Sequence, residues 1–206
     1  MYQVPGNRYR VNGEIQYNKF PQEFYGLGND TSVKNPVTYT PEYVLVEGSL
    51  DRSLNRDLKI KSLVFYRNQA LVNRGDFDTL HSNSVPWLAG RMDGGIGIGL
   101  LWDSRDNMTA TLKGSLLQVE HRGSLLRDAG KAYTCLNCEV KVFQTPFPGC
   151  TVGSNFLFRD ARGDVPLYIL PILGGMERLR GYEMGRFVGR SLILVQEDLR
   201  FPIFSG

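Results

Sequence analysis

The chain of 206 residues contains no hydrophobic run long enough to cross a membrane as a helix. A transmembrane helix needs about 20 consecutive apolar residues. The most apolar stretch, residues 165–173, is shorter and is interrupted by Pro166 and Pro171. This excludes a helical membrane protein. The opening residues 1–5 also lack the basic region, apolar segment and cleavage site of a signal peptide, so we expect either a cytosolic chain or one whose true N-terminus is missing.

Cysteine and histidine are scarce, with three Cys and two His in the whole chain. An odd number of cysteines does not suit a disulfide framework. Cys135 and Cys138 have the spacing of redox and zinc sites, and Cys150 and His121 are conceivable further ligands. A disulfide within a loop, or simply unpaired thiols, is the preferred interpretation. With only His81 and His121 there is little basis for a Ser-His-Asp triad, so we expect neither a metal site nor a catalytic site.

No block of one charge is present either. The chain has 24 Lys and Arg against 21 Asp and Glu, a net charge of +3, and the basic residues are spread along it. This distribution argues against a nucleic-acid partner. The glycine-rich segment 95–99 looks like a dinucleotide-binding loop, but it lies within an alternating pattern that no helix follows, so we expect no cofactor.

What the sequence does contain is alternation of apolar and polar residues, the pattern of β-strands. Between residues 8 and 19, Tyr9, Val11 and Ile15 fall on one face, whereas Arg10 and Glu14 fall on the other. We therefore predict an all-β chain. The expected strands, about eight in number, lie at residues 8–19, 39–50, 58–71, 94–103, 113–123, 138–145, 151–159 and 190–202.

The connections between these strands alternate in length. Long ones are predicted at residues 20–38, 72–93, 124–137 and 160–189, and short ones at 51–57, 104–112 and 146–150. Alternate connections of an up-and-down antiparallel sheet lie at the same end, so all long loops should share one end. This asymmetry, with strands of about 9 to 11 residues, is typical of outer-membrane barrels. A soluble antiparallel barrel or sandwich is the alternative, because alternation does not reveal which face is inside.

Two stretches carry a more specific signature. Residues 173–190 read Leu-Gly-Gly-Met-Glu-Arg-Leu-Arg-Gly-Tyr-Glu-Met-Gly-Arg-Phe-Val-Gly-Arg, and the strand after them ends in Asp198-Leu199-Arg200-Phe201-Pro202. Residues 97–107 form a glycine-alternating strand and an Asp-x-Arg-Asp-Asn turn. Both resemble the C-terminal barrel domain of the bacterial surface antigen and outer-membrane protein assembly factor superfamily, the BamA/TamA-like proteins. Residues 24–29, Phe-Tyr-Gly-Leu-Gly-Asn, resemble a segment of relatives from Bacteroidetes-type bacteria.

The turn itself has two interpretations. Asp103 and Asp106, with Arg105 between them, could be imagined as a catalytic carboxylate pair. In so tight a turn these side chains more naturally satisfy backbone donors and one another. We therefore assign Asp103, Arg105, Asp106 and Asn107 to a structural turn.

The resemblance implies a role for the tetrad Leu179-Arg180-Gly181-Tyr182. In the family this motif lies in an external loop that folds back into the barrel lumen, where its arginine binds acidic residues of the inner wall. A guanidinium with little water around it favours a bidentate carboxylate, and Gly181 would let the backbone turn tightly. The family's usual acidic partner lies on a strand expected after Gly206, so Asp198 is the nearest candidate partner of Arg180 within the chain. The alternative is a solvated external loop.

The resemblance also sets the expected function. Residues 1–206 should be an incomplete transmembrane barrel domain, with about eight of some sixteen strands and no periplasmic domains, from the middle of a longer protein or from a truncated gene product. The leading interpretation is a non-enzymatic outer-membrane component that inserts or translocates other outer-membrane proteins. Its partners would be outer-membrane lipid, nascent outer-membrane proteins and assembly accessory proteins. A channel, adhesin or surface antigen of the same fold is the second interpretation. An outer-membrane hydrolase is the third, and no Ser-His pair on one strand face supports it.

Overall fold

The computed structural model describes residues 2–3, 8–31, 36–73, 91–128, 131–176 and 178–201. Eight long strands form one antiparallel sheet. They are β2 (Tyr9–Lys19), β4 (Val37–Ser53), β5 (Leu58–Asn73), β6 (Arg91–Asp103), β7 (Gly114–Arg127), β8 (Tyr133–Phe147), β9 (Cys150–Gly163) and β12 (Ser191–Arg200). The short elements are β1 (Tyr2–Gln3), β3 (Gln22–Phe24), η1 (Leu167–Ile169), β10 (Ile172–Leu173) and β11 (Phe187–Val188).

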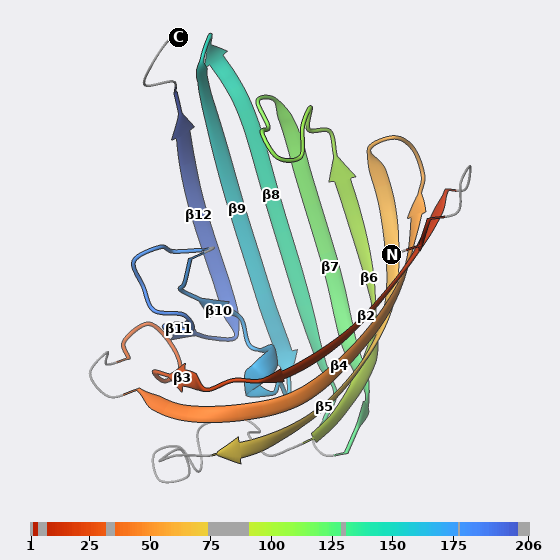
Figure 1. Ribbon diagram of the computed structural model, residues 1–206, viewed down its shortest axis with the longest axis vertical. Coiled ribbons are helices and arrows are strands. Elements are labelled where there is room, and N and C mark those ends of the chain that lie inside the picture. The colour runs from red at the N-terminus through yellow and green to blue at the C-terminus, as the bar shows by residue number, and fades with distance from the viewer. Residues whose placement is uncertain are drawn as a thin grey trace.

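The strands lie in the sheet in the order in which they occur in the chain, β1-β2-β4-β5-β6-β7-β8-β9-β12, and each pairs antiparallel with its neighbours. The sheet curves into an open trough whose edges do not meet (Figure 1). The predicted all-β, up-and-down and incomplete architecture is therefore confirmed. Every long strand coincides with a predicted one, although most extend further at one or both ends.

The short and the long connections lie largely at the ends of the sheet where they were predicted. The short turns after β4, β6 and β8 lie at one end of the trough, and the long connections after β2 and β9 lie at the other (Figure 1). The loop predicted at residues 72–93 falls mostly outside the described residues. The long loop predicted at residues 124–137 is wrong, because β7 continues to Arg127 and β8 begins at Tyr133. Ser124 does not end its strand: its hydroxyl accepts a hydrogen bond from the Tyr133 N–H at 3.0 Å.

The two faces of the trough differ in polarity. One cavity is lined by residues from β4 through β9, such as Tyr43 and Arg159, so these side chains lie on the concave face. The alternate positions, on the convex face, carry exposed apolar side chains; Ile15 is 79% exposed, Ile193 66% and Ile98 59%. A soluble barrel would bury its apolar face. An apolar exterior around a polar interior is instead the arrangement typical of a membrane barrel.

A small apolar core lies at the long-loop end, between the inner wall and the loops. It joins β3, the start of β4 and the connection after β9 to the ends of β8 and β9. Its buried members are Phe24, Val37, Tyr133, Ala161, Val165, Leu167, Leu170 and Val188. The core therefore holds the long connections against the concave face rather than joining two sheets.

Candidate functional site: the inner wall and the loop folded onto it

Four charged side chains form a network on the concave face. Arg122 of β7 donates from Nη1 to Glu47 of β4 at 2.7 Å and from Nε to Glu120 at 2.5 Å. Lys61 of β5 lies 3.6 Å from Glu47 and 3.4 Å from Glu120. Two cations and two carboxylates balance in charge. Each group is thus paired on a surface that faces the interior of the trough.

Glycines on β6 make this network possible. Gly99 pairs with Lys61 on one side and Glu120 on the other, and Gly97 lies between Leu63 and Arg122. A Cβ added at Gly97 would lie 3.0 Å from Leu63 Cγ and 3.1 Å from Arg122 Cγ. Long side chains from β5 and β7 therefore meet above β6 because β6 presents no side chains at these positions. The glycine alternation of β6 therefore has a structural purpose.

The long connection between β9 and β12 folds inward over the wall. It begins with the 3₁₀ turn η1 and continues as a two-stranded ribbon in which Ile172 pairs with Val188 and Leu173 with Phe187. Gly28, from the connection after β2, forms a bridge with Val188. In Figure 1 this segment lies within the trough beside β12, not out beyond the strand ends. Two loops far apart in sequence thus meet inside the trough.

The Leu179-Arg180-Gly181-Tyr182 tetrad occupies the tip of this ribbon. Leu179 has a positive φ of 58° and Gly181 a φ of 98°. Leu179 packs with Leu173 against Leu157, Leu192 and Leu194 of the inner wall. A positive φ is unfavourable for a leucine, so the apolar contact must offset a strained backbone. The tetrad is therefore attached to the wall through its leucine.

Arginines in the tip have different partners from those expected. Arg178 lies 3.3 Å from the Glu139 carboxylate of β8, whereas Arg180 is exposed and donates from Nε to the Met176 carbonyl at 3.3 Å. Asp198 does not meet Arg180: its ion pair is with Arg200, at 3.8 Å. The reason is position along β12. Leu179 packs at the level of residues 192–194, and four further residues of strand carry Asp198 about 13 Å away.

A third arginine of the loop, Arg186, is only 7% exposed. Its Nη1 donates to Thr31 Oγ1 and its Nη2 to the Thr31 carbonyl, across 155 residues of sequence. Its guanidinium lies 5.4 Å from the Tyr25 ring centre and 4.8 Å from that of Phe187. The Tyr25 hydroxyl donates to Glu23 at 2.6 Å, which raises the pKa of Tyr25 to about 12. Arg186 therefore joins the two long connections through hydrogen bonds and cation–π contacts.

A buried carboxylate anchors the start of the loop. Asp93 of β6 is 1% exposed and accepts hydrogen bonds from the hydroxyls of Tyr133 and Tyr168. Tyr168 belongs to η1, and burial raises the pKa of its phenol above the ordinary value, so the hydroxyl stays a donor. None of these residues, nor Glu139, was predicted from the sequence to belong to a site. Arg178 and Arg186 lie in the signature stretch 173–190, but no role was predicted for them. Only their places next to the glycine strand and the tetrad could have drawn attention to them.

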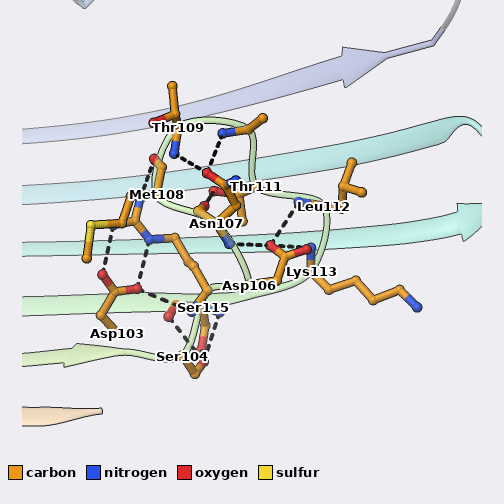
Figure 2. Close-up of polar contacts among 12 residues, drawn as sticks. Asp103, Ser104, Asp106, Asn107, Met108, Thr109, Thr111, Leu112, Lys113 and Ser115 are labelled. Atoms are coloured by element: carbon orange, nitrogen blue, oxygen red, sulfur yellow. Dashed lines mark hydrogen bonds and ion pairs between the residues drawn. The ribbon is translucent and has the colours of Figure 1, made fainter. Parts of the chain in front are cut away.

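The predicted turn residues form a closed set of hydrogen bonds at the opposite end (Figure 2). Arg105 donates to both oxygens of Asp103, at 2.8 Å each. Asp106 Oδ1 accepts the N–H groups of Asn107, Leu112 and Lys113, and Asn107 Oδ1 accepts those of Thr109 and Ala110. Desolvation opposes ionisation of Asp106, but the backbone donors outweigh it and lower its pKa. Each side chain is occupied by the turn itself.

The three thiols are free. Cys135 lies within β8 rather than in the loop predicted at residues 124–137, and Cys138 lies within β8 as well. Cys135 lines the concave cavity, so Cys138, three residues along the strand, faces the other side. In the described part of the chain no three His, Cys, Asp or Glu side chains gather as metal ligands. Likewise, none of the described helical segments has the length and hydrophobicity to cross a bilayer.

Comparison with known proteins shows the fold. No protein-family model matches the sequence, and neither does any curated protein. The structure is similar to that of BamA from Haemophilus ducreyi lacking POTRA domains 1–3, with a TM-score of 0.71 and 14% sequence identity over 96% of this chain. The match covers 43% of that crystallised chain. The curved sheet described here is therefore a partial β-barrel of the kind seen in BamA.

Proposed function

We propose that this chain forms part of the wall of a bacterial outer-membrane β-barrel and that the barrel inserts or translocates other outer-membrane proteins. The convex apolar face would contact lipid, and the charged concave face would line the lumen. The exposure of Ile15, Ile98 and Ile193 supports the first part. The similarity of the fold to BamA supports both parts.

The observation that carries the assembly role is the loop folded onto the inner wall. Arg178 pairs with β8, Leu179 packs on β9 and β12, and Arg186 ties the loop to the connection after β2. A loop held at three places inside the trough obstructs free diffusion through it. It also links strands that are not neighbours. Such an arrangement suits a barrel that acts on polypeptides at its wall. It suits an open pore less well.

Depletion of the full-length protein in its own bacterium tests this proposal. The amounts of other folded outer-membrane proteins, measured by heat-modifiable gel shift, should fall before growth stops. Wild-type protein should restore them, and the Arg178→Ala variant should restore them less well than the Arg180→Ala variant. Unchanged amounts of all other outer-membrane proteins would reject the assembly role.

A channel is the second candidate, favoured by the charge-balanced network of Lys61, Glu47, Glu120 and Arg122 on the inner wall. Paired charges on a water-filled lumen wall are typical of porins. Purified full-length protein in planar bilayers distinguishes the two. Steady conductance together with normal levels of other outer-membrane proteins after depletion would favour the channel.

A further inference from the structure

A cavity of about 470 Å³ lies between the concave face and η1. This volume is within the range of small-molecule sites. Its lining combines aromatic rings with arginines, among them Tyr43, Arg67, Tyr133 and Tyr168. The cavity is formed where the loop after β9 closes over the inner wall, and neither proposed role makes use of it.

Arg67 of β5 is the most distinctive group in this cavity. Its guanidinium carbon lies 3.8 Å from the Tyr43 ring centre and 4.3 Å from that of Tyr168. Its Nε donates to Gln69 Oε1 at 3.1 Å. Within the described residues no carboxylate pairs with Arg67. Two rings and the amide hold the guanidinium in place on the wall of the cavity.

The nearby carboxylate of Asp93 does not form an ion pair with Arg67. Asp93 is 1% exposed, and its Oδ2 is taken by the hydroxyls of Tyr133 and Tyr168. Asp93 and Arg67 both line the cavity, but almost none of the Asp93 surface is exposed. A fixed guanidinium fork that no carboxylate of the described residues pairs with matches a carboxylate in shape and charge. The tyrosine rings beside it favour a flat apolar body over a bare hydrated ion.

We propose that this cavity binds a small organic anion, a carboxylate on a flat apolar body, through the N–H groups of Arg67. The site goes beyond the proposed assembly role and does not depend on it. Tyr43 and Tyr168 position the guanidinium, and η1 closes the cavity over the bound molecule.

Calorimetric titration of the full-length protein in detergent with benzoate, benzyl alcohol and inorganic phosphate tests the proposal. Benzoate should bind saturably at one site, and both the neutral alcohol and phosphate should bind at least about tenfold more weakly. Arg67→Gln should weaken benzoate binding by a similar factor. Arg162→Gln is the matched control, because Arg162 has an 81% exposed side chain, and should leave the affinity unchanged. Equal binding of the alcohol, tighter binding of phosphate, or full affinity in Arg67→Gln would overturn the proposal.

A second measurement needs no variant and remains decisive if Arg67→Gln does not fold. Phenylglyoxal modifies accessible guanidinium groups, and peptide mass spectrometry locates the products. Benzoate should slow the modification of Arg67 several-fold and leave that of Arg162 unaffected. Equal modification of Arg67 with and without saturating benzoate would contradict the assignment.

Discussion

At the scale of single residues, the arginine that contacts the inner wall is not the one that the resemblance singled out. Arg178, not Arg180, reaches a carboxylate of the inner wall, and Leu179 makes the apolar contact with the wall. The two arginines sit two residues apart around a strained Leu179, so the backbone turn decides which of them faces the wall. A sequence motif contains both and does not distinguish them.

Arg178→Ala should therefore lower the free energy of unfolding by about 1–3 kcal/mol, because Glu139 would lose its partner in the loop and keep only Lys141, 3.2 Å away. Arg180→Ala, which removes an exposed side chain with one hydrogen bond to Met176, should cost less than about 0.5 kcal/mol. Urea titration of the full-length protein, followed by heat-modifiable gel shift, measures both values. A larger loss for Arg180→Ala would restore the motif arginine as the residue that holds the loop.

The turn at Asp106 should make the stability of the protein depend on pH in the acidic range. Three backbone N–H groups lower the pKa of Asp106 in the folded state, so its contribution is complete above the unfolded pKa, near 3.9, and disappears as pH falls through the lower folded value. Asp106→Asn keeps an acceptor but not the charge. The stability difference between wild type and Asp106→Asn, taken from urea midpoints, should shrink as pH falls from 6 to about 2. A difference independent of pH would show that the charge has no part in the turn.

At the scale of elements, β6 depends on its lack of side chains on the concave face. Gly97→Ala would bring a methyl group to 2.9 Å from the His121 carbonyl and close to Leu63 and Arg122, and should destabilise the sheet by about 1–3 kcal/mol. Gly13→Ala is the matched control within β2, since nothing lies within 4 Å of its added Cβ. Urea titrations of the two variants in the same detergent provide the comparison. Equal stability of both would mean that packing above β6 is unimportant.

The connection between β9 and β12 should be the first element to detach from the inner wall when Arg186 is replaced. Arg186→Ala removes two hydrogen bonds to Thr31 and two ring contacts. Trypsin should then cleave after Arg178 and Arg180 several-fold faster than in wild type, while the strands stay intact. Arg186→Lys retains the charge without the fork and should give an intermediate rate. Unchanged cleavage would show that the apolar core alone holds the loop.

The sequence predicted those elements that form through local interactions. It did not predict contacts between residues far apart in the chain. Alternation located every long strand, because each strand needs only its own period-two pattern to fit a curved sheet. It placed the end of β7 too early, since Gly123 and Ser124 look like a loop but continue the ladder. The contacts of Arg178, Arg186 and Asp93 span 39 or more residues and depend on which loops meet, which no local pattern encodes.

At the scale of the whole molecule, the two faces of the sheet differ in polarity, and this difference indicates what surrounds each face. Charged pairs gather on the concave face, and large apolar side chains remain exposed on the convex one. In water this arrangement would leave an extensive apolar surface uncovered, which soluble proteins avoid. This distribution is the one expected of a partial barrel whose outer face contacts hydrocarbon.

Spin-label accessibility in lipid vesicles tests this central claim most directly. Single cysteines would be placed in the full-length protein at Ile98 and Val195 on the convex face and at Gln118 and Gln196 on the concave face, after replacement of Cys135, Cys138 and Cys150 by serine. Labels at the first pair should collide mainly with oxygen, which concentrates in lipid, and labels at the second pair with a water-soluble nickel complex. Convex positions that are as accessible to nickel as the concave ones would contradict the account, because the apolar face would then lie in water.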